Sequence, residues 1–232
     1  MTTIQGDGFT VTIIKSKRRK TMALKVDNKG VSAHIPSTLP LATTQAFINQ
    51  RTSWIQKKLA QQQQRTVQEK QFEDGEVFLL LGENYTLRLF QSDEKALVKK
   101  TTSTIEFYGR LNKLSKPAIR ATIIDWYKQQ ADGYLTARTN WLSDVTSLQP
   151  ISITIKSYKA RWGSCSIKGE INFNWQLIQA PQDVIDYVIT HELCHLTHHN
   201  HSPKFWFLVE QFMPDYKRHR QWLKNNGHKL AL

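Results

Sequence analysis

Residues 191 to 201 read His-Glu-Leu-Cys-His-Leu-Thr-His-His-Asn-His, so a glutamate lies between two histidines that are four positions apart. On a helix, His191 and His195 lie one turn apart on the same face, where both imidazoles can bind one metal ion. Glu192 is offset by about 100° around that helix. This position suits a carboxylate that accepts a proton from water and is not itself a metal ligand. This spacing predicts a metal site with its own general base.

The segment before the motif has the pattern of a buried helix. Pro181 can occupy a first helical turn, and Asp183 suits the positive end of the helix. Apolar side chains then recur at helical spacing, at Val184, Tyr187, Val188, Leu193 and Leu196. We therefore expect the motif on a buried helix, with Cys194 as a packed thiol on another face.

A catalytic zinc site keeps three protein ligands and one open position, so a third ligand is needed. His198 lies about 10.5 Å along the helix from the first histidine, which favours a supporting or surface role. Glu210 is an alternative if a second helix returns its carboxylate to the ion. His201 is preferred, because His199-Asn200 can turn the chain back and Ser202-Pro203 can start a new helix.

The motif is one of several segments with a shared family pattern. They are Arg161–Cys165, Gly169–Asn174, Pro181, Tyr187–Val188, His191–His195 and His201–Trp206. Together they resemble the YgjP-like metal-dependent hydrolases, a bacterial group within the wider zincin and SprT-like set, over about residues 10 to 225. The resemblance implies zinc on the positions of His191, His195 and His201, Glu192 as the base, and a metallopeptidase activity.

Length and composition exclude several classes of protein. The 232 residues contain no run of 18 apolar side chains, and the first residues lack the basic-then-apolar layout of a signal peptide. Only two cysteines, Cys165 and Cys194, are present, which argues against a disulfide framework. We expect a cytoplasmic protein without a membrane partner.

The chain is strongly basic, with a formal net charge of +13. The cations cluster at Lys15–Lys20 and at Lys217–Arg220. Such clusters attract polyanions, including nucleic acid, without reading sequence, and no base-reading module is recognisable. We expect at most nonspecific polyanion contact through this surface.

The first part of the chain, residues 1–110, is predicted to be a β-rich lobe. Strand patterns lie at 9–15, 21–26, 31–35, 77–81, 85–90, 95–99 and 104–107, and a helix pattern lies at about 41–64. No internal repeat is visible in the sequence. A polar, Gln-rich segment that ends near residue 71 suggests a linker within this lobe.

Residues 111–232 are predicted to form the catalytic domain, an α+β zincin-like fold. Ser115 caps a long helix, and Ile151–Ile155 and Ile171–Trp175 read as strands. By resemblance, Arg161–Cys165 and Ile171–Trp175 are the segments expected to contact a substrate, by strand addition. The alternative is that the aromatic side chains of these segments fill the core and that Gly163 and Gly169 only make turns.

The favoured reaction is hydrolysis of a peptide or protein, with Zn²⁺ polarising the electrophile. Three residues are candidates to stabilise the developing oxyanion: Tyr158, Arg161 and His198. Hydrolysis of a nucleotide phosphoanhydride is an alternative, although no Walker-type loop supports it. A zinc-stabilised binding module is a third alternative, in which Glu192 would have no purpose.

Overall fold

The computed structural model describes residues 2–27, 30–63, 70–230 and 232. Two compact units make up the chain, Met1–Gln68 and Glu69–Leu232, which we call the first and the second unit. Each unit has a hydrophobic core of its own. The division lies well before residue 110, the domain boundary that we expected from the sequence.

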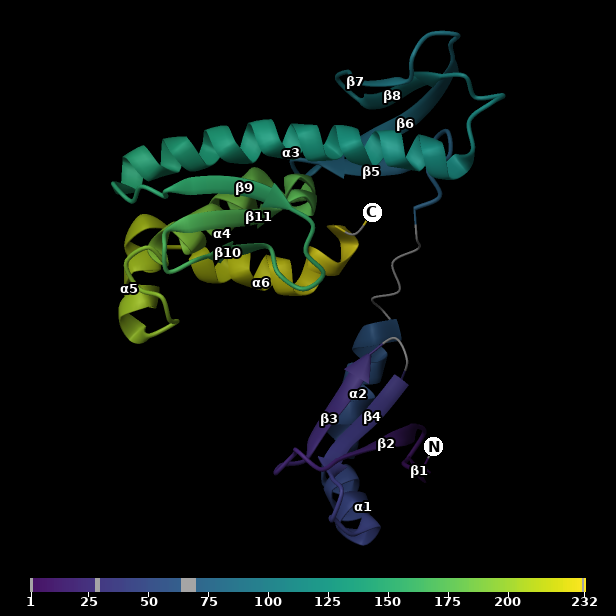
Figure 1. Cartoon of the computed structure of the whole chain (residues 1–232), viewed down its shortest axis with the longest axis vertical. Helices are drawn as coiled ribbons and strands as arrows, with labels where there is room; N and C mark the ends of the chain where they lie inside the picture. Colours follow the sequence, from purple (N-terminus) through teal and green to yellow (C-terminus); the bar gives the residue numbers. More distant parts are fainter. Residues whose placement is uncertain (1, 28–29, 64–69, 231) are drawn as a thin grey trace. The chain divides into compact units, whose positions relative to one another are not determined.

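The first unit is a four-stranded sheet followed by two helices (Figure 1). The elements are β1 (Thr2–Gln5), β2 (Thr10–Ser16), β3 (Ala23–Asp27), β4 (Gly30–Pro36), α1 (Leu41–Gln50) and α2 (Thr52–Gln63). The strand order is β1-β2-β4-β3, with β2 and β4 parallel and the outer pairs antiparallel. A strand at Thr2–Gln5 was not predicted.

Buried and partly exposed side chains alternate along β4, and this alternation shows which face of the sheet is buried. In β4 the side chains of Val31, Ala33 and Ile35 are buried, and the residues between them are partly exposed. Ile48 of α1 and Ile55 of α2 pack against the buried face with no exposed surface. The single helix expected at 41–64 is therefore two helices, separated at Arg51, whose backbone (φ −110°, ψ 7°) leaves the helical region.

The second unit begins with the same sheet topology. Its strands are β5 (Val77–Leu80), β6 (Glu83–Gln91), β7 (Leu97–Lys100) and β8 (Thr104–Gly109). They lie in the order β5-β6-β8-β7, again with a parallel central pair between two antiparallel outer pairs, and a helix again follows. The sequence shows no internal repeat, because the repeated feature is strand order and not side-chain identity.

The helix α3 (Lys116–Thr146) connects this sheet to the rest of the second unit (Figure 1). It starts at Ser115, whose hydroxyl accepts a hydrogen bond from the Ala118 amide at 3.4 Å. Tyr127 of α3 is fully buried and donates its hydroxyl to the Leu79 carbonyl of β5 at 2.9 Å. These contacts explain why the sheet groups with the C-terminal half of the chain.

A third sheet and three further helices complete the second unit. They are β9 (Ser152–Lys156), β10 (Gly163–Cys165), β11 (Glu170–Asn174), α4 (Gln182–Cys194), α5 (Pro203–Phe212) and α6 (Tyr216–Asn226), with short 3-10 turns η1 (Trp175–Gln179) and η2 (Gly227–Leu230). The strand order is β10-β11-β9, so β11 is central, antiparallel to β10 and parallel to β9. None of the helices in the described part of the chain is long and apolar enough to span a membrane.

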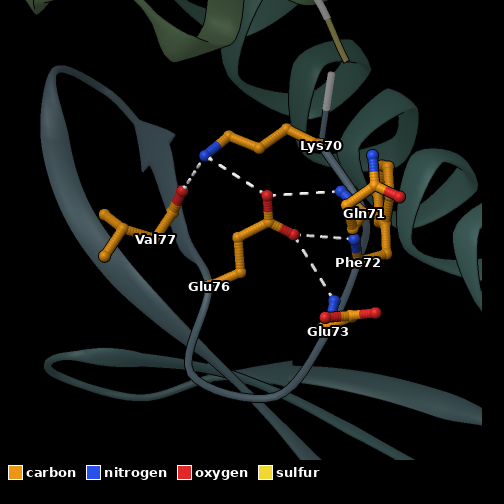
Figure 2. Close-up of polar contacts among 6 residues, drawn as sticks. All are labelled: Lys70, Gln71, Phe72, Glu73, Glu76 and Val77. Carbon is orange, nitrogen blue, oxygen red and sulfur yellow. Dashed lines mark hydrogen bonds and ion pairs between the residues drawn. The ribbon is translucent and has the colours of Figure 1, made fainter. Parts of the chain in front are cut away.

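Figure 2 shows how the chain enters the second unit around one carboxylate. Glu76 accepts hydrogen bonds from the backbone amides of Gln71 (3.3 Å), Phe72 (2.7 Å) and Glu73 (3.4 Å), and Lys70 pairs with it at 3.7 Å. Phe72 has a left-handed backbone (φ 58°), which is costly for an aromatic residue, yet its ring is buried in the core. The Glu76 carboxylate stabilises this conformation.

Candidate metal centre

The structure brings three predicted histidines together at the end of α4. His191 lies in the last turn of α4, and His195 is its C-cap. The chain then turns back to α5, whose cap Ser202 accepts a hydrogen bond from the Phe205 amide at 3.4 Å. As a result His201 reaches the other two histidines, and one ligand atom of each lies within 4.8 Å of the others.

The ring nitrogens of these histidines are available as ligands. His195 places Nδ1 at 2.9 Å from the His198 carbonyl oxygen, which can only accept, so Nδ1 carries the proton and Nε2 has a free lone pair. The Nε2 atoms of His191 and His201 are 3.0 Å apart. Burial, with smaller effects of His195, His201 and Arg220, lowers the pKa of His191 to about 3, which keeps this ring neutral.

This arrangement fits a tetrahedral metal ion. Two nitrogens bound at about 2.0–2.1 Å in tetrahedral geometry are about 3.3 Å apart, close to the 3.0 Å between His191 and His201. Neutral imidazoles are the form in which histidine binds zinc. The three side chains therefore suit one ion without a large rearrangement of the backbone.

Aromatic side chains of α5 form the wall behind the histidines. The Phe205 ring is fully buried, and its centroid lies 4.9, 4.4 and 4.9 Å from those of His191, His195 and His201. Trp206 stacks on His201 with centroids 5.5 Å apart and an interplanar angle of 25°. Because Nδ1 of His191 is buried with no hydrogen-bond partner among the described residues, ring packing orients this side chain.

Glu192 lies beside the histidines in a buried position. Its side chain is 6% exposed, and this burial raises its pKa to about 8, with an opposing effect of Arg161. A bound dication would lower that pKa, because it favours the ionised carboxylate. Gly163 of β10 lies against the carboxyl group: a Cβ at this position would lie 2.6 Å from Glu192 Oε1. Gly163 thus lies in a strand, although the sequence suggested a turn there. Gly169 (φ +84°) does lie in a turn.

The segment between β9 and β10 is held near the centre by Asn174. Its side-chain amide donates to the carbonyls of Tyr158 (3.1 Å) and Arg161 (3.4 Å), and its backbone amide donates to that of Trp162 (2.8 Å). Two of the residues predicted to stabilise the oxyanion, Tyr158 and Arg161, lie on this segment. The guanidinium carbon of the exposed Arg161 lies 5.5 Å from the centroid of the Tyr158 ring. The third candidate, His198, contacts the centre through its carbonyl group.

Other candidate residues lie outside the histidine cluster. Glu210 is exposed on α5 and pairs with Lys217 at 3.2 Å, so the structure does not bring its carboxylate to the histidines. Cys194 is fully buried, and burial raises the pKa of its thiol to about 12, as expected of a packed cysteine. Burial, and then Glu192, raise the pKa of the half-buried Cys165 to about 11.

The family comparison adds evidence that the geometry alone lacks. The model of the family described as "YgjP-like, metallopeptidase domain" matches residues 20–226, which is most of the chain. The chain belongs to the YgjP-like family. The match extends over both units of this YgjP-like protein, and confirms the resemblance inferred from the sequence.

Two solved structures are similar to part of this YgjP-like chain. The metallopeptidase zymogen abylysin of Pyrococcus abyssi matches at 24% identity with a TM-score of 0.35, covering 39% of this chain and 93% of its own. The metallopeptidase zymogen jannalysin of Methanocaldococcus jannaschii matches at 20% identity with a TM-score of 0.36, covering 40% and 95%. The comparison with curated proteins found no match.

Proposed function

We propose that this protein is a zinc-dependent peptidase with a zincin-like catalytic domain in its second unit. One observation carries the proposal: an HExxH helix and a returning loop bring three imidazoles within reach of one ion, with a buried carboxylate next to them. The family match to a metallopeptidase domain supports this combination. Catalytic zinc sites have this composition of three protein ligands and one open position.

In this proposal His191, His195 and His201 hold the metal. Zinc, when bound, would polarise the scissile carbonyl group and make water more acidic. The His198 carbonyl fixes the tautomer of His195 through their 2.9 Å hydrogen bond. Phe205 excludes water from the wall behind the rings, because it is fully buried against all three of them.

Glu192 acts as the general base. Its carboxylate would accept a proton from the attacking water and later deliver it to the leaving amine. The missing side chain of Gly163 leaves the space that this carboxylate occupies. The positive charge of Arg161 lowers the pKa of Glu192 against the larger effect of burial, so we assign Arg161 a role in stabilising negative charge at the centre.

Strand β10 is where we place the peptide substrate. It pairs with β11 on one side only, whereas β11 is paired on both sides. An extended peptide could therefore add to β10 but not to Ile171–Trp175, which was the other segment expected from the sequence. A peptide along β10 would pass Gly163 and so lie next to Glu192.

Activity assays test this proposal directly. Zinc-loaded protein is offered a fluorogenic peptide library and, separately, a panel of nucleoside triphosphates, with Glu192→Gln as the blank and Glu210→Gln as the matched control. Peptide cleavage that is lost only in Glu192→Gln supports a peptidase. Release of pyrophosphate or phosphate with the same dependence would establish the nucleotide alternative, a pyrophosphatase-type hydrolase, instead. Neither reaction in a zinc-bound protein would favour a binding module.

A further inference from the structure

The excess positive charge of the chain is concentrated in the first unit. Residues 1–68 contain eleven lysines and arginines, two aspartates and no glutamate, and therefore have a formal net charge of +9. The other 164 residues carry only +4 of the total of +13. The unit that lacks the histidine cluster thus carries most of the charge.

The densest group of cations in the first unit lies at the connection between β2 and β3. Four consecutive cationic residues, Lys17 to Lys20, occupy this connection. Lys17, Arg18 and Lys20 are exposed, and Arg19 is partly exposed. Among the residues that the structure describes, no carboxylate forms an ion pair with any of the four, so their charge faces solvent.

The repeated topology of the second unit provides an internal comparison. The equivalent connection, between β6 and β7, is Ser92–Ala96, which contains Asp93, Glu94 and Lys95. The same strand order is therefore built with a connection of formal charge −1 in one unit and +4 in the other. The fold does not require the cations, which indicates that they have a role at the surface.

An exposed aromatic side chain on the first unit complements these charges. Trp54 on α2 is 40% exposed, although Ile55 next to it is fully buried. Lys57 follows Trp54 by three positions and is also exposed, so the two side chains share one helical face. Cations that contact phosphates and aromatic rings that stack on bases together are the chemistry of single-stranded nucleic-acid binding.

We propose that the first unit binds the phosphate backbone of nucleic acid through the β2–β3 connection, with Trp54 as a stacking residue. Arg18 and Arg19 each present a planar guanidinium group that can bind a phosphate with two hydrogen bonds. A membrane surface fits less well, because surface-bound elements need a broad apolar face next to their cations. Here the exposed large apolar side chains of the described first unit are only Ile14, Leu41 and Trp54.

Salt dependence of binding measures the contribution of the four cations. The full-length protein is titrated with a fluorescein-labelled single strand of about 20 nucleotides at several salt concentrations. Neutralising all four charges, in Lys17→Gln/Arg18→Gln/Arg19→Gln/Lys20→Gln, should reduce the slope of log K against log salt by about 3, since each phosphate contact contributes about 0.7. Trp54→Ala should weaken binding about fivefold or more without changing that slope.

A matched variant removes four charges from the second unit: Lys95→Gln/Lys99→Gln/Lys100→Gln/Lys113→Gln. It should retain the wild-type slope, and Arg18→Lys/Arg19→Lys should retain most of it because charge is conserved. Equal losses in both fourfold variants would overturn the proposed location. No binding of the wild type at about 50 mM salt, or tighter binding to phosphatidylserine vesicles than to the oligonucleotide, would overturn the proposed ligand.

Discussion

At the scale of single residues, Gly163 and Glu192 depend on each other. The glycine lies in β10 and the glutamate in α4, and a Cβ on Gly163 would overlap the carboxyl group. We therefore predict that Gly163→Ala displaces Glu192 and lowers peptidase activity by at least tenfold, on the order of the effect of a small misplacement of a catalytic group. The activity is measured as kcat/KM on a peptide found in the library screen.

Gly133→Ala is the control for this change. Gly133 lies within α3, and an added Cβ would meet nothing within 4 Å. This substitution should stabilise the protein by about 0.5–1 kcal/mol and leave activity unchanged. Full activity of Gly163→Ala would show that the carboxylate does not need its observed position.

Substitution of Glu192 distinguishes its role in catalysis from a role in metal binding. Glu192→Gln has nearly the same shape but cannot accept a proton, so the rate should fall by about 10²–10⁴ while the zinc content stays at that of the wild type. His191→Ala should instead lose zinc, since it removes a ligand. Elemental analysis of both purified variants checks this difference, and loss of zinc from Glu192→Gln would make the glutamate a ligand.

Trp206 is predicted to position the third histidine. It stacks on His201 and is itself stacked on Tyr216, with centroids 5.3 Å apart, and covered by Arg220 at 4.7 Å. Trp206→Ala should weaken zinc affinity about 10- to 100-fold, the effect usual for residues that orient a ligand. Competition with a chromogenic chelator measures this affinity, and Trp206→Phe should recover part of it. An unchanged affinity in Trp206→Ala would contradict the positioning role.

At the scale of elements, the turn before β5 depends on Glu76. This carboxylate accepts three backbone hydrogen bonds and holds Phe72 in its left-handed conformation (Figure 2). Glu76→Ala should destabilise the second unit by about 1–3 kcal/mol, because three backbone amides, one of them part-buried, lose a charged acceptor. Urea unfolding measures this loss, with Glu73→Ala as the control, since that exposed side chain pairs only with Lys116 on the surface.

Elements with a long, regular pattern were predicted from the sequence. The pattern before His191 and the capped helix at Ser115 both correspond to helices of the structure, α4 and α3. β10 was missed, because a three-residue strand is too short to show alternation. The wall behind the histidines was also missed, because only three-dimensional packing brings the rings of Phe205 and Trp206 to the three histidines.

At the scale of the whole molecule, two separate cores predict two unfolding transitions. All three histidines of the candidate centre lie in the second unit, so zinc should raise only the transition of that unit. Ile35→Ala, in the core of the first unit, should lower only the other transition, by about 2–5 kcal/mol. Calorimetry with and without a chelator tests both expectations, and a single transition that responds to both changes would mean that the units unfold together.

The position of Trp206 also makes the candidate centre visible by spectroscopy. Its indole ring stacks on the ring of His201, with centroids 5.5 Å apart, so a paramagnetic ion bound to that histidine would lie close enough to quench the tryptophan emission. The chain has seven tryptophans, so Trp206→Phe identifies the part of the signal that comes from this ring. Titration with Co²⁺ or Cu²⁺ should therefore report occupancy of the three histidines as a loss of fluorescence, with no label attached and no substrate known.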